Sequence, residues 1–490
     1  MKTLEILSII GVLALLAEIF SFKKFLLPIV LIGLLGAIGA AIYDWNTNIH
    51  YYHNMLTFDN YALLFSMVLC GTVFLWFLSS QSFFSGDSHL TDKSSLAIFS
   101  LIGAVIIVSY SNLLMLFIGI EILSIPLYVL AGSNKESLAS NEAALKYFLM
   151  GAFASAILLF GIALIYGASG TFDISVLGTY LTPSIPYATN PPTGLLHLGQ
   201  GNDALLYAGI LMMLIGMAFK VSAVPFHFWA PDVYEGAPTP VTAYMSSIVK
   251  TSAFAAFLRL FFVAFSTQGE IWGNIIWAMA ALTILLGNIT AVYQSSVKRM
   301  LAYSSIAHAG YLLLAILSMN QFSAGSVLYY SAAYSIATIA AFTVLSIIES
   351  KKVSPGGGDL EGASFESFNG LAKRNPLLAV AMTIAMLSLA GIPPLAGFFG
   401  KYYLFSSALQ SGHLWIVLIA ALGSLIGVYY YLRVIIAMYG PAPTLPEGKG
   451  ADTELLPLGE VGWGVKLSLI LTILLSLALG FFPELVIRLI

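Results

Sequence analysis

The amino-acid sequence predicts an all-α, polytopic membrane protein of about fourteen transmembrane helices. The helices are expected to form two inverted five-helix repeats, each containing a broken helix. Three observations predict this fold class: a very apolar composition, apolar stretches of bilayer length separated by loops of alternating charge, and prolines inside two of those stretches.

The composition identifies the lipid bilayer as the solvent. Hydrophobic residues make up 59% of the 490 residues and charged residues 9%, whereas a soluble domain carries about 25% charged residues. A net charge of −3 without any basic run argues against a nucleic-acid partner. The only cysteine, Cys70, excludes an internal disulfide and a cysteine-ligated cluster. The N-terminal stretch holds Glu5 and Glu18 and lacks a small-residue cleavage site, so we expect a retained first span.

Apolar windows of about 20 residues are long enough to cross a bilayer. The fourteen expected spans lie at about 4–22, 25–43, 59–79, 94–110, 112–132, 142–168, 204–224, 241–266, 271–292, 300–318, 323–348, 376–410, 413–438 and 463–487. No connection between them is long enough to be a catalytic domain. The longest connections, at about 169–203, 349–375 and 439–462, are rich in Gly, Pro, Ser or Thr.

Loop charges predict the orientation. Basic residues follow the odd-numbered spans, and the loops after the even-numbered spans contain none. The basic residues concerned are Lys23, Lys24, Lys93, Lys135, Lys298, Arg299, Lys351, Lys352, Lys373, Arg374 and Lys449. Only the loop after the seventh span differs, because it carries Asp232 and Glu235 instead. By the positive-inside rule, the basic loops face the cytoplasm and both termini face outward.

The chain divides into four expected parts. Residues 1–93 form an N-terminal three-span segment, 94–266 the first repeat, 271–438 the second repeat, and 439–490 a linker with the C-terminal span. The glycine-rich stretch PGGGDLEGAS at 355–364 lacks the Lys-Ser/Thr pair of a phosphate-binding loop and is expected to be a flexible connector.

Prolines break two of the expected spans. In GMAFKVSAVPFHFWAPDVYEGAPTP (216–240), Pro225 removes a backbone donor close to Lys220. In LSLAGIPPLAGFFGKYYLF, Pro393 and Pro394 precede Lys401. As one helix, 376–410 would extend about 52 Å across a core of about 30 Å, so it must be broken or strongly tilted. Paired broken spans are typical of transporters built from repeats.

Charged residues inside the spans indicate the functional site. Glu121, Lys220, Lys250, His308 and Lys401 all fall within expected spans. A central charge costs roughly 2.5–3.5 kcal/mol, so these groups must be paired, hydrated or neutral. One interpretation is structural ion pairing, for example between Glu121 and Lys220. The other is a proton relay, in which desolvation favours the neutral amine and a nearby carboxylate favours the charged one.

Several other polar residues in the spans allow a structural interpretation. His308 alone can be a packing residue. His227 can bond the carbonyl freed by the break or relay protons, and Lys146 can extend its amine to the cytoplasmic surface. Arg259, Arg433 and Lys466 we interpret as interface or packing charges.

Four stretches carry a family resemblance: SNEAALKYFLMGAFASAILLFGIALIYGASGTFD, VSAVPFHFWAPDVYEGAPTPVTAYMSSIVK, VKRMLAYSSIAHAGY and LAGIPPLAGFFGKYYLF. They resemble the subunit N family of proton-pumping NADH:quinone oxidoreductase, respiratory complex I. The related L and M subunits share the fold. However, their seventh-span motif has a leucine-proline-leucine-histidine core, L adds a lateral helix, and M usually has Glu in place of Lys401. The equivalent subunit of photosynthetic NAD(P)H dehydrogenase-like complexes also matches.

The resemblance implies residue roles. Glu121 matches a glutamate that modulates the lysine matched by Lys220. Lys250 matches a connecting lysine, and Lys401 one that completes the route outward. The positions matched by Lys146, His227, Tyr303 and His308 belong to the central hydrophilic axis.

The resemblance also implies partners. NADH, FMN, iron–sulfur clusters and quinone are expected in partner subunits, with no cofactor or metal in this chain, and the other membrane-arm subunits are expected to bind it. The alternatives are a subunit of a Mrp-type or stand-alone cation/proton antiporter, and a structural membrane anchor whose buried charges merely pack.

Overall fold

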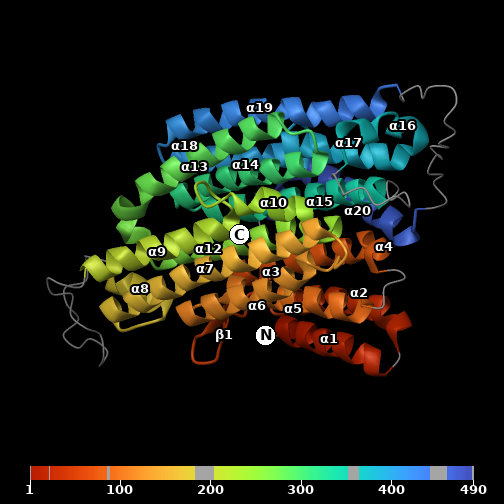
Figure 1. Cartoon of the computed structure of the whole chain (residues 1–490). Coiled ribbons are helices and arrows are strands. Elements are labelled where there is room, and N and C mark those ends of the chain that lie inside the picture. Colours follow the sequence, from red (N-terminus) through yellow and green to blue (C-terminus); the bar gives the residue numbers. More distant parts are fainter. Residues whose placement is uncertain are drawn as a thin grey trace.

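The computed structural model describes residues 2–20, 22–84, 89–181, 203–350, 363–441 and 461–487. Within them, long helices lie roughly side by side, with the N-terminal helices at one edge of the molecule and α19 at the other (Figure 1). Most of the connector at 355–364 and most of the linker at 439–462 lie outside the described residues.

The first half of the chain runs from the N-terminal helices through the first break to α12. Its elements are α1 (Lys2–Ile19), α2 (Lys23–Tyr43), β1 (Ile49–Tyr51), β2 (Leu56–Phe58), α3 (Asn60–Ser79), α4 (Gln81–Phe84), α5 (Leu90–Ser109), α6 (Leu113–Ala131), α7 (Leu138–Ser169), α8 (Ile174–Tyr180), α9 (Asp203–Val221), α10 (Trp229–Gly236), α11 (Thr239–Tyr244), the π-helical turn η1 (Met245–Val249) and α12 (Lys250–Val263).

The second half contains the other break. Its elements are the 3-10 turn η2 (Ser266–Gln268), α13 (Gly269–Val292), α14 (Val297–Ser318), α15 (Ser323–Ser350), η3 (Phe365–Phe368), α16 (Leu371–Arg374), α17 (Pro376–Ala390), α18 (Ala396–Gln410), α19 (Leu414–Tyr439), α20 (Trp463–Phe481) and α21 (Glu484–Ile487).

The helices match the expected spans. In the described part of the chain, twelve helical segments are long and apolar enough to cross a membrane. The remaining two expected spans are α1, which is 18 residues long and carries Lys2, Glu5 and Glu18, and the pair α17 and α18, each 15 residues long. The prediction that 376–410 cannot be one continuous helix is therefore confirmed.

One element of the fold was not expected. A small antiparallel hairpin pairs Ile49 with Phe58 and Tyr51 with Leu56 between α2 and α3. Its second strand is buried. Six paired residues leave too short an alternating pattern to stand out beside the long apolar spans.

The two halves repeat the same helix contacts. Helix α5 packs on α6 as α13 packs on α14, and α7 packs on α9 and α10 as α15 packs on α17 and α18. Helix α12 contacts α5, and α19 contacts α13 in the same way. This correspondence agrees with the predicted repeat architecture.

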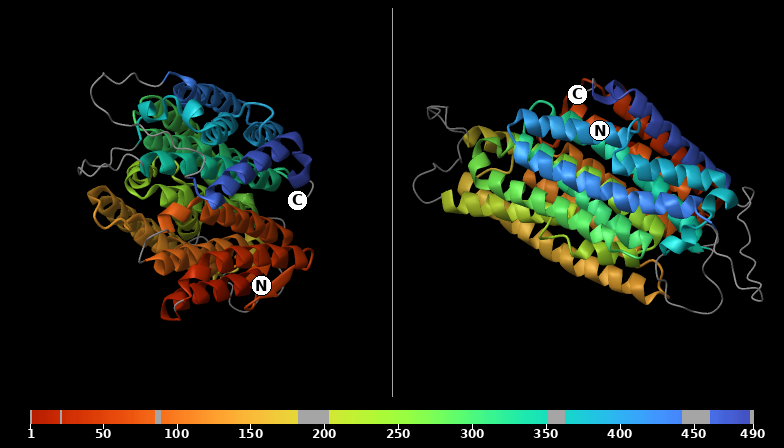
Figure 2. Two further views of the ribbon diagram at one scale, coloured as in Figure 1. Left: turned by 90° about the vertical axis from the view of Figure 1, so that its right-hand side faces the viewer. Right: turned by 90° about the horizontal axis from the view of Figure 1, so that it is seen from above.

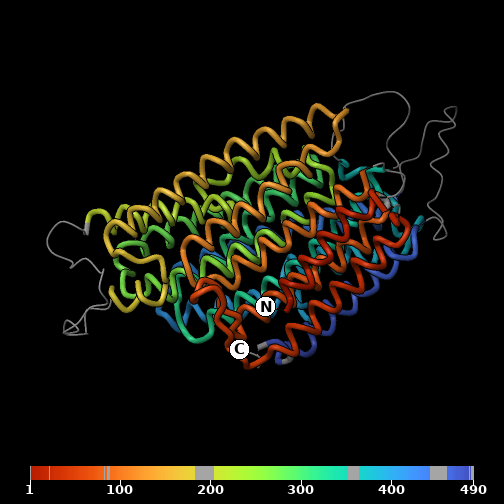
Figure 3. Tube along the Cα trace, turned by 90° about the horizontal axis from the view of Figure 1, so that it is seen from below, coloured from red at the N-terminus to blue at the C-terminus, as the bar shows by residue number. Residues whose placement is uncertain are grey.

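The most enclosed helices lie at the centre of the bundle. In the most apolar window of each helix, 94% of α14 and 89% of α15 is buried, against 33% of α2 and 39% of α19. The C-terminal helix α20 returns to pack on α3, so it lies beside the N-terminal helices when the molecule is viewed from above or below (Figures 2 and 3). Most side chains on α14 are therefore enclosed by other helices of the bundle.

Candidate functional site: a buried lysine axis

The first break separates α9 from α10. Helix α9 ends at Val221, and Ser222 has a φ of 61°. The carbonyl of Phe219 accepts hydrogen bonds from the Ser222 backbone N–H (3.0 Å) and the Trp229 indole Nε1 (3.2 Å). The Val224 N–H donates to Thr283 Oγ1 on α13 (2.9 Å). The break is thus held by hydrogen bonds from both halves of the chain.

His227 lies just past the break, and its buried Nδ1 has no hydrogen-bond partner among the described residues. The Trp229 indole bonds the Phe219 carbonyl of the break. The indole is held in this position because its ring stacks on Tyr147 of α7.

The second break separates α17 from α18 and seats Lys401. Gly391 has a φ of 82°, which favours glycine. A Cβ at this position would lie 2.8 Å from Cδ of Lys401, so a side chain here would displace the lysine. The carbonyl of Ala390, at the end of α17, has no helical donor because residue 394 is proline. It accepts a hydrogen bond from Lys401 Nζ (2.8 Å).

Lys220 lies at the end of α9 and is 5% exposed. Its Nζ donates to Ser124 Oγ on α6 (2.5 Å). Among the described residues, no ion pair within 4.0 Å joins it to Glu121, whose buried Oε1 has no hydrogen-bond partner. The charge of Glu121 still acts on Lys220 electrostatically. The two groups are therefore near enough to influence each other without being bonded.

Lys250 begins α12 and is 2% exposed. Its Nζ donates to the carbonyl of Ser305 on α14. The π-helical turn Met245–Val249 directly precedes it. Such turns are rare and are frequent at functional sites. Lys250 therefore connects the first half of the chain to the central helix of the second.

His308 lies between Lys250 and Lys401. Its Nδ1 bonds the hydroxyl of Tyr330, and its Nε2 bonds the hydroxyl of Tyr431 (2.9 Å). A cavity of about 10 Å³ is lined by His308, Tyr330 and Lys401, among others. That volume is about the minimum for one water molecule.

The partners of the three lysines are chemically alike. Lys220 bonds a serine hydroxyl, Lys250 a carbonyl, and Lys401 both a carbonyl and the Ser424 hydroxyl (2.8 Å). In the described residues none of the three has a carboxylate within 4.0 Å. A hydroxyl can donate or accept, so the contacts to serine can be kept whether the amine is charged or neutral. A direct ion pair would instead favour only the charged form.

Lys146 and Tyr303 lie in a different cluster, at the end of the bundle that the loop charges place inside. Lys146 bonds Asp232 on α10 (2.9 Å), and Arg299 on α14 bonds Asp232 (3.1 Å) and Glu235 (2.6 Å). The Arg299 guanidinium lies over the Tyr303 ring, 6.0 Å from its centroid. Lys146 is 40% exposed. The structure therefore brings neither residue to the buried lysines.

Comparison with known proteins identifies the family. The family model for the transmembrane region of the NADH:quinone oxidoreductase and Mrp antiporter proteins matches residues 111–427. The chain belongs to this family. It is 42% identical to NADH-quinone oxidoreductase subunit N of Cytophaga hutchinsonii, over 91% of this chain and 89% of that protein. The subunit N of Flavobacterium psychrophilum is 41% identical, over 92% and 91% of the two chains.

Solved structures agree with this assignment. A chain of respiratory complex I from Thermus thermophilus superposes with a TM-score of 0.80 at 32% identity, covering 99% of this chain and 98% of that one. A chain of the Mrp complex from Dietzia superposes with a TM-score of 0.82 at 22% identity, covering 99% and 95%. The second likeness is one of fold alone.

Some polar groups on the axis of this family member escaped sequence reasoning. They are Ser124, Ser304, Ser424, Tyr330 and Tyr431. Serines are common in membrane helices, where they bond the carbonyl four residues earlier, so their presence alone marks nothing. Tyr431 lies in a run of three tyrosines, Tyr429–Tyr431, of which only some are buried. No sequence signal separates the serines and tyrosines of the axis from the others.

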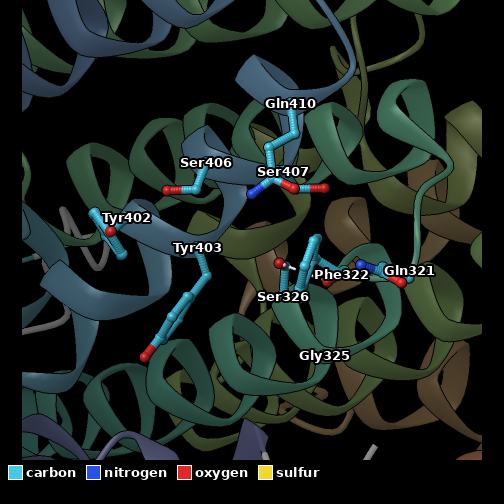
Figure 4. Close-up of a pocket in the computed structure, with 9 residues that line it drawn as sticks. All are labelled: Gln321, Phe322, Gly325, Ser326, Tyr402, Tyr403, Ser406, Ser407 and Gln410. Carbon is cyan, nitrogen blue, oxygen red and sulfur yellow. Dashed lines mark hydrogen bonds between the residues drawn. The ribbon is translucent and has the colours of Figure 1, made fainter.

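A larger hollow, of about 640 Å³, lies apart from the axis, at the N-terminal end of α15 and the C-terminal end of α18 (Figure 4). Tyr403 and Gln410 line it. On a helix of 3.6 residues per turn, both stand nearly opposite Lys401. The hollow therefore opens on the other face of α18.

Within the described residues no group of three or more His, Cys, Asp or Glu is placed to hold a metal ion.

Proposed function

We propose that this chain moves protons across the bacterial inner membrane as a membrane-arm subunit of NADH:quinone oxidoreductase. Redox reactions in other subunits drive the movement. One observation carries the proposal: Lys220, Lys250 and Lys401 are buried along the bundle with no carboxylate partner among the described residues, and each bonds a group that tolerates loss of its charge. The relatives named as subunit N of this enzyme support the choice of complex.

We assign the following roles along the axis. Glu121 modulates the charge on Lys220 from a short distance, and Lys250 receives the proton at the centre. His308 and its two tyrosines lie between Lys250 and Lys401, and Lys401 releases the proton outward. The breaks at Pro225 and at Pro393 and Pro394 provide the carbonyls and the room that these side chains need.

Other residues act at the inner end of the route. Lys146 and Tyr303 hold α10 in place through Asp232 and Arg299. His227 stands at the first break with an unused ring nitrogen, which suits a passing proton. In this proposal the parts at 1–93 and 439–490 support the two repeats at 94–266 and 271–438.

The proposal extends to partners and orientation. NADH, FMN, iron–sulfur clusters and quinone would be bound by partner subunits, and neighbouring membrane-arm subunits would contact this chain. Both termini would lie on the periplasmic side. The likeness of the fold to the Mrp complex makes an antiporter subunit the second candidate. Identity of about 40% to subunit N over most of the chain favours the first.

Purification of the tagged chain tests the proposal. We expect it to co-purify with flavin and iron, and vesicles containing it to take up protons when NADH is added. Purification without flavin or iron, with sodium-driven proton release on an imposed gradient, would instead assign it to an antiporter.

A further inference from the structure

Two charged groups at the inner ends of α14 and α15, one buried and one half-buried, are not used by the route described above. Lys298, in the first turn of α14, is 6% exposed, and its Nζ donates to the Ala237 carbonyl (2.7 Å). Glu349, in the last turn of α15, is half-buried and accepts a hydrogen bond from the Thr239 hydroxyl. The other carboxylate oxygen of Glu349, Oε1, is buried and has no partner among the described residues.

Two carboxylates act on Lys298, but neither forms a close ion pair with it. Glu349 and Glu235 both act on it electrostatically. Neither lies within 4.0 Å of its amine, and Glu235 is bonded to Arg299 (2.6 Å). Asp232 and Lys146 belong to the same group of charges at this end of the bundle, together with Glu142. A buried cation without a close counter-ion is costly. Transfer of one proton from Lys298 to Glu349 removes both charges, and the reverse transfer restores them.

Helix α14 leads from Lys298 to the lysine axis. Ser305 is seven residues, or almost two full turns, beyond Lys298 on the same face of the helix. It lies about 10 Å deeper along the axis. The Ser305 carbonyl accepts the hydrogen bond from Lys250. His308 follows after nearly one further turn. Lys298 therefore stands on the inner side of the residue that receives the proton.

We propose that Glu349 takes up protons from the inner aqueous side and that Lys298 passes them toward Lys250. The half-buried Glu349 side chain accepts a proton that reaches it from the inner aqueous side. Its carboxyl then donates that proton to the neutral amine of Lys298, which restores the carboxylate and leaves an ammonium. The long Lys298 side chain and water carry the proton over the remaining distance to Lys250. This inference rests on the proposed function.

A purely structural role of Glu349 would give a different pH dependence of proton uptake. If Glu349 only ties α15 to α11 through Thr239, its replacement should lower the amount of assembled complex and affect activity equally at every pH. If it collects protons, its loss should matter most where protons are scarce. The pH dependence of proton uptake therefore separates the two roles.

The test compares Glu349→Gln, Glu349→Asp and the control Glu136→Gln in the intact complex. Glu136 is an exposed carboxylate in an inner-side loop. NADH-driven proton uptake into inverted vesicles would be measured from pH 6 to pH 9 and normalised to complex content on a native gel. We expect Glu349→Gln to lose at least half of the uptake at high pH and less at low pH. Glu349→Asp should recover much of it, and Glu136→Gln should match the wild type.

Two results would overturn the assignment: wild-type uptake by Glu349→Gln at all pH values, or a loss that is equal at every pH. Lys250→Met, measured in the same series, separates this inference from the proposed function. If Lys250→Met pumps normally, the relay itself fails. If Lys250→Met blocks pumping while Glu349→Gln does not alter it, only the uptake site is wrong.

Discussion

At the scale of the residue, the buried lysines are unusual because none of them has, among the described residues, the carboxylate partner that burial of a charge ordinarily demands. Three centrally placed cations would cost roughly 8–10 kcal/mol on insertion scales if they were unpaired and charged. Lys220, Lys250 and Lys401 meet hydroxyls and carbonyls rather than carboxylates. Such partners reduce the cost of either protonation state without fixing one of them.

Glu121→Gln tests whether the unbonded carboxylate modulates Lys220. The substitution keeps the shape but removes the negative charge that favours the protonated amine. A 1.4 kcal/mol change in that interaction shifts the protonation equilibrium about tenfold, so coupled turnover should fall by roughly two- to tenfold. The complex should still assemble. The measurement is NADH oxidation and proton uptake per assembled complex, and unaltered values for both would leave Glu121 as a packing residue.

Sequence reasoning could predict the charged members of the axis but not their contacts. Charged groups in apolar spans are costly enough to stand out, so Lys220, Lys250, His308 and Lys401 were found. The direct pair of Glu121 with Lys220, one of the two readings, is not formed, because the Lys220 amine bonds Ser124 instead. The resemblance assigns Lys146 and Tyr303 to the hydrophilic axis, and in the structure both lie in the ion-pair cluster around Asp232 and Arg299.

At the scale of the element, close helix contacts build the two halves. Gly103 on α5 faces the backbone of α6, where an added Cβ would lie 2.3 Å from the Leu123 nitrogen. Gly287 on α13 faces α14 similarly, with the Ala307 nitrogen 2.6 Å from such a Cβ. Small residues allow membrane helices to approach closely. Equivalent helix pairs in the two halves thus use the same device.

Gly103→Ala tests this contact, with Gly71→Ala on α3 as the matched control. A Cβ at Gly103 requires two helix backbones to separate, which should cost about 1–3 kcal/mol, as for other overpacked sites. A Cβ at Gly71 meets nothing within 4 Å. We expect less assembled complex, and a lower thermal unfolding temperature, for Gly103→Ala alone. Equal behaviour of the two variants would contradict the close packing of α5 on α6.

The broken helices could be predicted because proline removes a backbone donor. The details of each break could not. Trp229 and Ser222 satisfy the Phe219 carbonyl, and a threonine from α13 reaches across to the Val224 N–H. These partners are brought to the break by tertiary packing, and a local sequence pattern does not predict which residues will pack there.

At the scale of the whole molecule, apolar length and the proline breaks predict the fold class, and the four motif stretches predict the family by resemblance. Twelve apolar helical segments, α1 and one divided span account for the fourteen predicted crossings. The orientation stays a prediction. It can be tested at two exposed positions that lie at opposite ends of the bundle: Ser266 between α12 and α13, and Asn134 between α6 and α7.

Single cysteines at these positions should label from opposite sides of the membrane. The background is Cys70→Ser, since Cys70 is free and buried. Ser266→Cys should react with an impermeant maleimide in whole cells, and Asn134→Cys only in inverted vesicles. Labelling of both from one side would contradict the predicted topology.

Lys220→Arg tests the central claim, that the buried lysines release and rebind protons, most directly. Arginine keeps the positive charge and can keep the contact with Ser124, but it does not deprotonate in proteins. The variant complex would be quantified on a native gel, and its NADH oxidation, its NADH-driven proton uptake and its electron transfer from NADH to an artificial acceptor would be measured. The account predicts normal assembly and artificial-acceptor activity, with coupled turnover and proton uptake at least tenfold lower. Full pumping by Lys220→Arg would contradict it, because Lys220 would then serve without ever losing its proton.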